Sequence, residues 1–395
     1  KYLFEMANIR NHDSWVHGND PDAATRKAKD LLRMAVTKVA LLEPLQETTV
    51  EITQSALVVG GGVAGMVASL HLADQGYPVS LVEAKSELGG HARQLRQTWR
   101  GEDVTVFLRD LIARVNDNSL IRVYPNSELQ EVKGFVGNFH SKIRIGGTNG
   151  VKFTTRRHGV AILAPGGRAI ETDEYLCDRH SRVIRWHELE NAYEAGKLQE
   201  AASIVFIQCV GSREPQRPYC SKICCTFSIQ QSIKLKETYP DMDVYILYRD
   251  IRTYGQREEL YRRARAAGVI FIRYSLDEKP LVETDSEGGL RVVVKDHILQ
   301  RPLVISPDFV TLATAIETQG AESLARLFKV PLNQDKFFLE AHAKLRPVEC
   351  ATDGVFLCGV AHYPKPLEES IAQAQGAASR AITILAQKTL QVSGQ

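Results

Sequence analysis

Four of the seven cysteines lie within 17 consecutive positions of the chain, in the spacing Cys209-x10-Cys220-x3-Cys224-Cys225. Four thiolates are the usual ligand set of one [4Fe-4S] cluster, and the long first interval lets Cys209 fold back over the other three. A zinc site is an alternative, although adjacent cysteines do not suit the Cys-x2-4-Cys pairs of structural zinc. Two further alternatives are a thiol–disulfide redox pair and buried cysteines that have no chemical role. The spacing favours metal or redox chemistry in a reducing compartment over a disulfide framework.

A second stretch has the residue types of a dinucleotide site. The apolar run 56–59 predicts a buried strand, and Gly60-x-Gly62-x-x-Gly65 follows it and opens a helix of small residues. The first glycine permits a tight turn, the second leaves no side chain between backbone and pyrophosphate, and the third allows close helix packing. The helix N-terminus then faces the phosphates. Glu83, at the end of the next predicted strand, stands where an acid accepts from ribose hydroxyls. The alternative is a glycine-rich loop of another α/β protein.

The same alternation of strand and helix occurs again in the second half of the chain. Strands are predicted at 202–208, 243–249 and 269–273, with helices at 225–237 and 258–267. Where a second glycine turn is expected, the chain has the cysteine segment instead. The pattern predicts an α/β protein with two Rossmann-type domains, the second of which lacks a phosphate cradle.

Two further motifs resemble those of the FAD-binding members of the two-dinucleotide-binding, thioredoxin-reductase-like flavoprotein superfamily. Gly89 and Gly90 follow the ribose acid, and the strand beginning at Val160 ends in Ala-Pro-Gly166-Gly, with proline where threonine is usual. The resemblance implies FAD as the cofactor. It adds Gly166 to the site, together with Gly359 after the last strand and Ala372 in the final helix, 367–386. The N-terminus of that helix is expected to face the flavin ring.

The predicted elements divide the chain into three parts. Residues 1–50 are an N-terminal helical extension, whose helix begins at Asp20-Pro21 and is expected to dock through one apolar face. Residues 51–176 and 305–395 are the FAD-binding domain, with a helix at 100–115, a hairpin at 132–145 and a strand at 309–315 that returns to this domain. Residues 177–304 are the degenerate NAD-type domain with the cysteines.

The bulk composition is that of an ordinary globular protein. The 395 residues are 44% hydrophobic and 24% charged, and a formal net charge of +2 gives no argument for nucleic acid binding. No apolar run reaches the roughly 18 residues of a membrane span. The N-terminus shows no signal-peptide pattern, so we expect a cytoplasmic location. Because the chain begins at Lys1 rather than methionine, we expect it to be a fragment of a longer protein.

Segments spread over nearly the whole chain resemble the family of heterodisulfide reductase A subunits. They include Ser14-Trp-Val-His17, 206–213, Tyr219-Cys-Ser-x-x-Cys-Cys225, 254–258 and 370–374. The resemblance implies that FAD binds at Gly60, Gly62, Gly65, Glu83, Gly89 and Gly90, and that Cys209, Cys220, Cys224 and Cys225 ligate one [4Fe-4S] cluster. It also implies other subunits of a heterodisulfide-reductase-like complex as partners, iron–sulfur electron carriers, and a homodimer within that complex.

The family's flavin exchanges electron pairs while its cluster passes single electrons, and in some members the flavin bifurcates electrons. The resemblance therefore implies an oxidoreductase in which no acid–base side chain is decisive. Lys222 and Arg213 are candidates for tuning the cluster, and Lys365 for tuning the flavin. Cys177, Cys350 and Cys358 are expected to be small apolar residues at strand ends.

The sequence also departs from the family's pattern. Asp13 stands where members often have the cysteine of an N-terminal cluster, and the chain runs through 145–151 without the inserted ferredoxin domain of larger members. We therefore expect a short form, or a fragment, with one flavin and one cluster. A stand-alone thiol–disulfide oxidoreductase resembling thioredoxin reductase is the alternative, with Cys224/Cys225 or Cys220/Cys224 as its redox pair. A non-catalytic scaffold is a third possibility.

Overall fold

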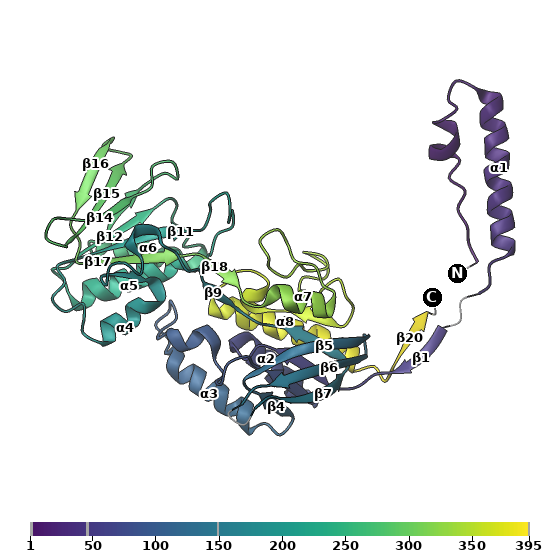
Figure 1. Cartoon of the computed structure of the whole chain (residues 1–395), viewed down its shortest axis with the longest axis horizontal. Coiled ribbons are helices and arrows are strands. Elements are labelled where there is room, and N and C mark those ends of the chain that lie inside the picture. Colours follow the sequence, from purple (N-terminus) through teal and green to yellow (C-terminus); the bar gives the residue numbers. More distant parts are fainter. Residues whose placement is uncertain (1–2, 45–46, 148–149, 394–395) are drawn as a thin grey trace. The chain divides into compact units, whose positions relative to one another are not determined.

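The computed structural model of the chain describes residues 3–44, 47–147 and 150–393. These residues form two compact units (Figure 1). The first comprises the two ends of the chain, up to Glu51 and from Lys388 onward. The second comprises Ile52–Gln387 and holds all the candidate site residues.

The first unit contains a π-helix at Arg10–Ser14, the helix α1 (Pro21–Ala40) and the antiparallel pair β1 (Glu47–Glu51) and β20 (Thr389–Ser393). The Asp20 side chain accepts from the backbone N–H of Ala23 at 2.9 Å, which confirms the predicted helix start. No residue of α1 is buried within this chain, so the expectation of a docked apolar face is not met there. The strand β20 pairs with β1, although its residues were predicted to belong to the FAD-binding domain.

The glycine motif lies in a parallel sheet with the strand order β19-β8-β2-β3-β4. Its helix α2 packs against α8 and α3. The bounds of these elements are β2 (Ala56–Val59), α2 (Val63–Asp74), β3 (Val79–Val82), α3 (Val104–Asp117), β4 (Ile121–Tyr124), β8 (Val160–Leu163), β19 (Val355–Leu357) and α8 (Leu367–Leu385). The predicted strand–turn–helix–strand unit is therefore confirmed.

An antiparallel sheet and a short helix cover the opposite face of this parallel sheet. The antiparallel sheet has the order β5-β6-β7, and Phe139 and Ile143 of β6 share one buried cluster with Leu57 and Leu163 of the parallel strands. The bounds are β5 (Ser127–Phe135), β6 (Asn138–Ile145), β7 (Lys152–His158) and α7 (Ala321–Phe328). The predicted hairpin is confirmed as β5 and β6, and β7 was not predicted. Part of the segment 145–151, residues 148–149, lies outside the described residues.

A second parallel sheet, of order β10-β17-β11-β12-β13, forms the other half of this unit. Phe206 and Ile246 of its strands pack with Ile229 of α5 on one face, and Ile207 packs with Val292 of an antiparallel sheet on the other. The bounds are β10 (Val183–Arg185), α4 (Leu189–Glu194), β11 (Ser203–Val210), α5 (Cys224–Thr238), β12 (Asp243–Tyr248), α6 (Glu258–Ala266), β13 (Ile270–Arg273), β14 (Leu281–Thr284), β15 (Leu290–Asp296), β16 (Arg301–Ile305) and β17 (Phe309–Thr314).

The position of β17 corrects one prediction. Its residues pair in parallel with β10 and β11, so this strand completes the second sheet rather than returning to the first. The chain crosses between the two halves through β9 (Gly167–Ala169) and β18 (Ile316–Thr318), which pair antiparallel with each other. We therefore propose a domain boundary after β17 instead of at residue 305.

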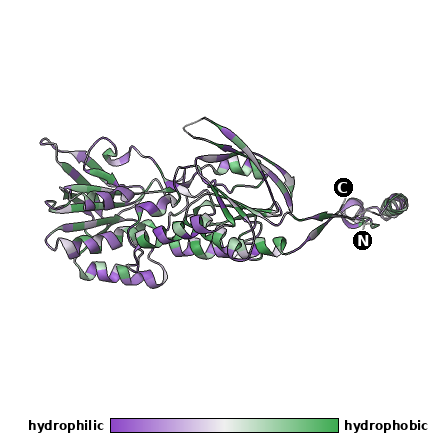
Figure 2. Cartoon of the chain, turned by 90° about the horizontal axis from the view of Figure 1, so that it is seen from below, coloured by the Kyte–Doolittle hydropathy of each residue, from purple (hydrophilic) through white to green (hydrophobic). Residues whose placement is uncertain are grey.

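The distribution of hydrophobic residues follows the layers. In Figure 2 several helices of the second unit are banded in purple and green, because they pack one face on a sheet while the other faces water. Strands β8 and β2, at the centre of the first sheet, are buried at every position. Within the described ranges, no helix combines the length and the apolar character that crossing a membrane requires.

Candidate functional site

The glycine turn brings the backbones of three elements into close contact. Gly60 has φ +109°, and a Cβ added there would lie 2.0 Å from the carbonyl oxygen of Ala164 at the end of β8. A Cβ at Gly65 would lie 1.8 Å from the carbonyl oxygen of Gly60. Side chains are excluded at both positions, and α2 consequently begins directly against β2 and β8.

A cavity of about 690 Å³ opens above this turn. Among its lining residues are most of the cofactor-binding candidates: Gly60, Gly62, Glu83, Gly89, Gly90, Gly166 and Gly359. A Cβ at Gly62 would meet no heavy atom within 4 Å, so this position faces open space at the N-terminus of α2. The remaining two candidates differ, because Gly65 serves the packing of α2 and Ala372 is exposed on α8 outside the lining.

The carboxylate of Glu83 is held rigidly at the wall of the cavity. It is 9% exposed, and its two oxygens accept from the backbone N–H groups of Gly61 at 2.6 Å and Lys85 at 2.8 Å. The open cradle at Gly62, the helix N-terminus and this fixed acid fit the phosphates and ribose of a dinucleotide. The residues present therefore fit FAD, and the cavity has the size of a cofactor site.

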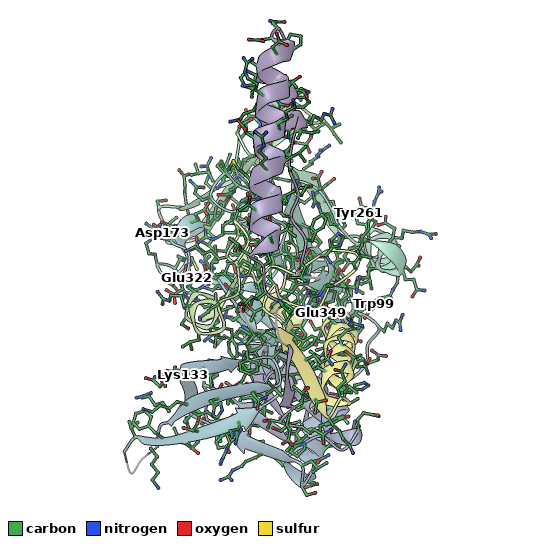
Figure 3. All side chains as sticks on the ribbon, turned by 90° about the vertical axis from the view of Figure 1, so that its right-hand side faces the viewer. Trp99, Lys133, Asp173, Tyr261, Glu322 and Glu349 are labelled. Carbon is green, nitrogen blue, oxygen red and sulfur yellow. The ribbon has the colours of Figure 1, made fainter. Side chains whose placement is uncertain are left out.

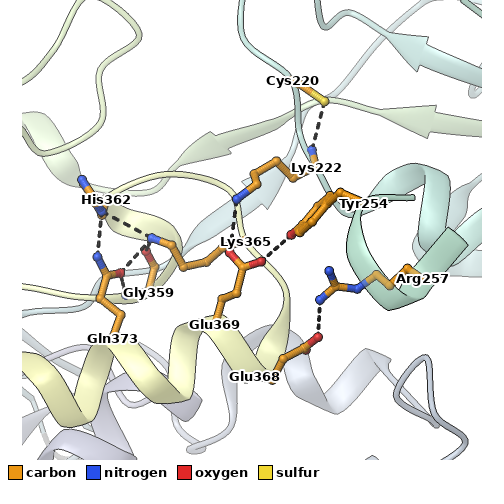
Figure 4. A network of polar contacts seen from close by, with 10 residues as sticks. All are labelled: Cys220, Lys222, Tyr254, Arg257, Gly359, His362, Lys365, Glu368, Glu369 and Gln373. Atoms are coloured by element: carbon orange, nitrogen blue, oxygen red, sulfur yellow. Dashed lines mark hydrogen bonds and ion pairs between the residues drawn. The ribbon is translucent and has the colours of Figure 1, made fainter. Parts of the chain in front are cut away.

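The first turn of α8 lines the other end of the cavity. Leu367, Glu368 and Ser370 belong to the lining, together with Lys365 just before the helix. The Lys365 ammonium donates to the carbonyl oxygen of Gly359 at 2.9 Å and to Oε1 of Gln373 at 2.8 Å (Figure 4). Burial lowers the pKa of Lys365 to about 8, with a partly opposing contribution from Cys358.

Two glutamates of α8 join this helix to the cysteine half of the unit. Glu369 accepts from the Lys222 ammonium at 3.1 Å and from the Tyr254 hydroxyl, and Glu368 pairs with Arg257 (Figure 4). Glu368 also accepts from the Trp99 indole N–H at 2.9 Å, and Figure 3 labels Trp99 beside the yellow helix α8. These contacts connect the two halves across the rim of the cavity.

The four cysteines of the predicted cluster are brought together. Cys209, Cys220, Cys224 and Cys225 are all free and at most 9% exposed. A hydrogen bond with Cys225, followed by burial and the nearby thiols of Cys209 and Cys220, raises the pKa of Cys224. The same hydrogen bond lowers the pKa of Cys225. Among the described residues, however, no group of three or more histidine, cysteine or acidic side chains is arranged to hold a metal ion. The donor set fits an iron–sulfur cluster by residue type, but in the described residues these side chains are not arranged around one.

The backbone of the cysteine segment is strained. Cys209, Arg213 and Lys222 have φ between +57° and +62°, a region that side-chain-bearing residues rarely adopt. Such conformations cost of order 1–3 kcal/mol each and persist where the surroundings fix them, often at functional sites. A cationic group lies close to the first cysteine of the segment, since the Arg213 guanidinium is 4.0 Å from the Cys209 sulfur.

The cysteine segment also adjoins the cavity. Ile223, Thr226 and Phe227, which flank Cys224 and Cys225 at the start of α5, belong to its lining. The sequence did not indicate the roles of Trp99, Arg257 and Glu368 at the rim. These roles could not be predicted because the contact between the two halves depends on tertiary structure. The one available signal was that Arg257 and Glu368 lie in or near segments that resemble the family.

Comparisons with known proteins agree with this architecture. A model of the NAD(P)-binding Rossmann-like domain matches residues 58–111. The thioredoxin reductases of T. acidophilum and Lactococcus lactis superpose with TM-scores of 0.57 and 0.59, each over 84% of this chain and over 97% and 99% of theirs. At 14% sequence identity, these two structures establish the fold alone. The predicted thioredoxin-reductase-like fold is therefore confirmed.

Sequence relatives identify the family. The A subunit of the H(2):CoB-CoM heterodisulfide,ferredoxin reductase of Methanothermobacter marburgensis is 34% identical over 473 residues, which cover 96% of this chain and 71% of that protein. The second iron-sulfur A subunit of the CoB–CoM heterodisulfide reductase of Methanopyrus kandleri is 34% identical, over 98% of this chain and 72% of its own. The first alignment is longer than this chain of 395 residues, so that relative has additional residues within the aligned region. The chain belongs to the family of heterodisulfide reductase A subunits, which are oxidoreductases.

Proposed function

We propose that the chain is the flavin and iron–sulfur electron-transfer subunit of a heterodisulfide-reductase-like complex. FAD occupies the cavity above Gly60 and Gly62, with Glu83 on its ribose, and the four clustered cysteines ligate one [4Fe-4S] cluster. Other subunits and iron–sulfur carriers supply and collect the electrons, and the chain forms a homodimer in the complex. Flavin supplies two-electron chemistry and the cluster one-electron chemistry.

The observation that carries this proposal is that the start of α5, the helix that carries Cys224 and Cys225, adjoins the cavity, although the four cysteines themselves are not among its lining residues. Ile223 and Thr226 line the cavity, while Cys224 and Cys225 lie between them in sequence. A flavin in the cavity and a cluster at the start of α5 would be neighbours, as an electron relay requires. The buried cysteines also lie near Arg213 and Arg249, whose charges offset those of thiolates.

In this proposal the residues of the chain bind FAD and fix its orientation. The α2 N-terminus and Gly62 receive the pyrophosphate, and the first turn of α8 closes the far end of the cavity. Lys365 is a cation held at this end, since its ammonium is fixed by Gly359 and Gln373. Glu368 and Glu369 hold the two halves together through Arg257 and Lys222, which keeps the distance between the two centres fixed.

An anaerobic absorbance spectrum with iron and sulfide counting tests the proposal. We expect flavin bands, a broad cluster absorbance that dithionite bleaches, and about four irons per chain. Cys220→Ser should lose the iron and keep the FAD. Cys350→Ser is the matched control, because Cys350 is buried and lies outside the cysteine segment. Full iron in Cys220→Ser, or equal iron loss in both variants, would exclude the proposed ligand set.

A flavin-dependent thiol–disulfide oxidoreductase is the second candidate. Its support is that the thiols are free and not preassembled around a metal ion. Cys224 and Cys225 suit it poorly, because adjacent Cα atoms lie about 3.8 Å apart and disulfides favour about 4.4–6.8 Å. The pair would have to be Cys220 and Cys224. Absence of iron and sulfide from anaerobically purified protein would favour this candidate.

A further inference from the structure

A second cavity lies at the carboxyl edge of the second parallel sheet. It measures about 390 Å³ and shares no lining residue with the flavin cavity. Arg213 follows β11, Arg249 and Asp250 follow β12, and Arg273 ends β13, so three adjacent parallel strands deliver these side chains to one place. Ligands of open parallel sheets bind at this edge. The location alone therefore makes the cavity a candidate binding site.

The charges that line this cavity are unbalanced. Three guanidinium groups face a single carboxylate, Asp250, which pairs with Arg213 at 2.5 Å and with Arg273 at 3.6 Å. Asp250 also lies 3.9 Å from Arg252, and is thus shared by several cations. Of the three arginines that line the cavity, Arg249 is the buried one, and burying positive charge without a counter-charge is unfavourable. A bound anion would supply the missing negative charge.

Two nitrogen atoms at this cavity have no hydrogen-bond partner among the described residues. Arg249 is only 8% exposed, and its Nη atoms donate to the backbone carbonyls of Ser212 and Arg213, whereas its Nε has no hydrogen-bond partner. Nε2 of His297, at the end of β15, is buried and unpartnered as well. Buried polar atoms are normally satisfied, so such exceptions call for an explanation. Both residues line the cavity, although these two nitrogen atoms are closed to solvent, so a ligand would meet other atoms of the same side chains.

The nearby thiols account for only some of the cationic residues at this cavity. Arg213 approaches the Cys209 sulfur, and Arg249 donates to the Cys209 carbonyl at 3.5 Å. In the part of the chain that the structure describes, no hydrogen bond or ion pair joins Arg273 or His297 to a cysteine. Arg273 instead donates to the Arg249 carbonyl at 3.1 Å, which holds its guanidinium at the mouth. If the cations served only to offset thiolate charge, Arg273 and His297 would have no role at this cavity.

We propose that this cavity, the Arg249–Arg273 pocket, binds the phosphoryl group of a small phosphorylated molecule. Guanidinium groups match phosphate oxygens through paired, charge-assisted hydrogen bonds, and several of them converge here. The volume exceeds what one phosphate needs, so the pocket has room for a ligand that extends beyond that group. The site is separate from the flavin and cysteine chemistry, and its occupancy would report to the cysteine segment through Arg213 and Arg249.

Calorimetric titration of the anaerobically purified full chain with inorganic pyrophosphate tests this proposal. Arg273→Gln should weaken binding about tenfold or more, since it removes a charged hydrogen bond. Arg273 suits the test because its side chain is 64% exposed, so the variant should fold. Arg262→Gln is the matched control: this exposed arginine of α6 pairs only with Glu259 within the described chain and should leave the affinity unchanged.

Three results would overturn the proposal. The first is no pyrophosphate binding to the wild-type chain at low salt, and the second is equal weakening by Arg273→Gln and Arg262→Gln, which would indicate non-specific attraction. The third is binding of succinate as tight as that of pyrophosphate, with the same dependence on Arg273, which would indicate a carboxylate site. Iron and FAD contents are measured in every variant, so that loss of the flavin or cluster is distinguished from loss of this pocket.

Discussion

Replacing Gly62 with alanine separates the fold of the glycine turn from its use as a phosphate cradle. Gly62 has φ −73° and ψ −179°, a conformation that alanine adopts readily, and its Cβ would meet no protein atom within 4 Å. Because alanine lowers the conformational entropy of the unfolded chain relative to glycine, the substitution stabilises the native state by about 0.4–1 kcal/mol. Loss of glycine as the N-cap residue of α2 offsets this by a few tenths to about 1 kcal/mol. The free energy of unfolding of the apoprotein should therefore change by less than about 1 kcal/mol.

Cofactor affinity should respond differently. The new methyl group stands in the open space where the pyrophosphate of FAD is proposed to lie. Forcing an extra carbon into a packed contact costs about 1–3 kcal/mol, which corresponds to about 5- to 150-fold weaker binding. Urea unfolding of the apoprotein and FAD titration followed by flavin fluorescence measure the two quantities separately.

Gly65→Ala provides the matched comparison, because its Cβ would collide with the Gly60 carbonyl rather than with a ligand. We expect this variant to lose about 1–3 kcal/mol of apoprotein stability. Unchanged FAD affinity in Gly62→Ala would refute the cradle. A stability loss in Gly62→Ala as large as in Gly65→Ala would show that the turn differs from the one described.

Two further predictions concern stability. Burial lowers the pKa of His158 to about 4, so between pH 6.5 and pH 4 the unfolded chain binds a proton that the native chain does not; its contribution of about 3 kcal/mol is present above pH 6.5 and lost as the pH falls. Urea titrations from pH 7 to pH 5 should show about 2 kcal/mol of this loss in the wild type and a weaker pH dependence in His158→Asn. Asp103→Ala removes the side chain that caps α3 and should cost about 1 kcal/mol, whereas Asp110→Ala, exposed on the same helix, should change the free energy of unfolding by less than about 0.5 kcal/mol.

Local sequence signals predicted the elements whose cause is local. The unit from β2 to β3 follows from an apolar run and glycine spacing, and α5, α6 and β12 follow from periodicity. The sheet to which β17 belongs was predicted wrongly, because the apolar run of a buried strand does not identify its partners. The same limit hid the pairing of β20 with β1, since register between distant segments is set by tertiary structure.

The candidate site divides in the same way. Glycines, Glu83 and the cysteines were visible as motifs, because each motif lies within one short segment. The contacts of Glu368 with Arg257 and Trp99 were not visible, because these residues come from three distant segments that meet only when the two halves pack. The Arg249–Arg273 pocket could not be predicted from the sequence for a related reason. Its arginines, Arg213, Arg249 and Arg273, become neighbours only through the order of strands β11, β12 and β13.

The two Rossmann-type units differ at one equivalent position, the connection from the first strand to the first helix. Between β2 and α2 the connection is Gly60–Gly62, and the helix N-terminus is left open. Between β11 and α5 the connection is longer, and Cys224 and Cys225 are the first residues of the helix. A helix N-terminus favours a negative group, whether a phosphate or a thiolate. Because thiols hold the start of α5, we expect no pyrophosphate cradle in the second unit. An anion in the second unit would instead bind the arginines at the ends of β12 and β13. These can hold a phosphoryl group, but the helix N-terminus that a full dinucleotide uses is not available there.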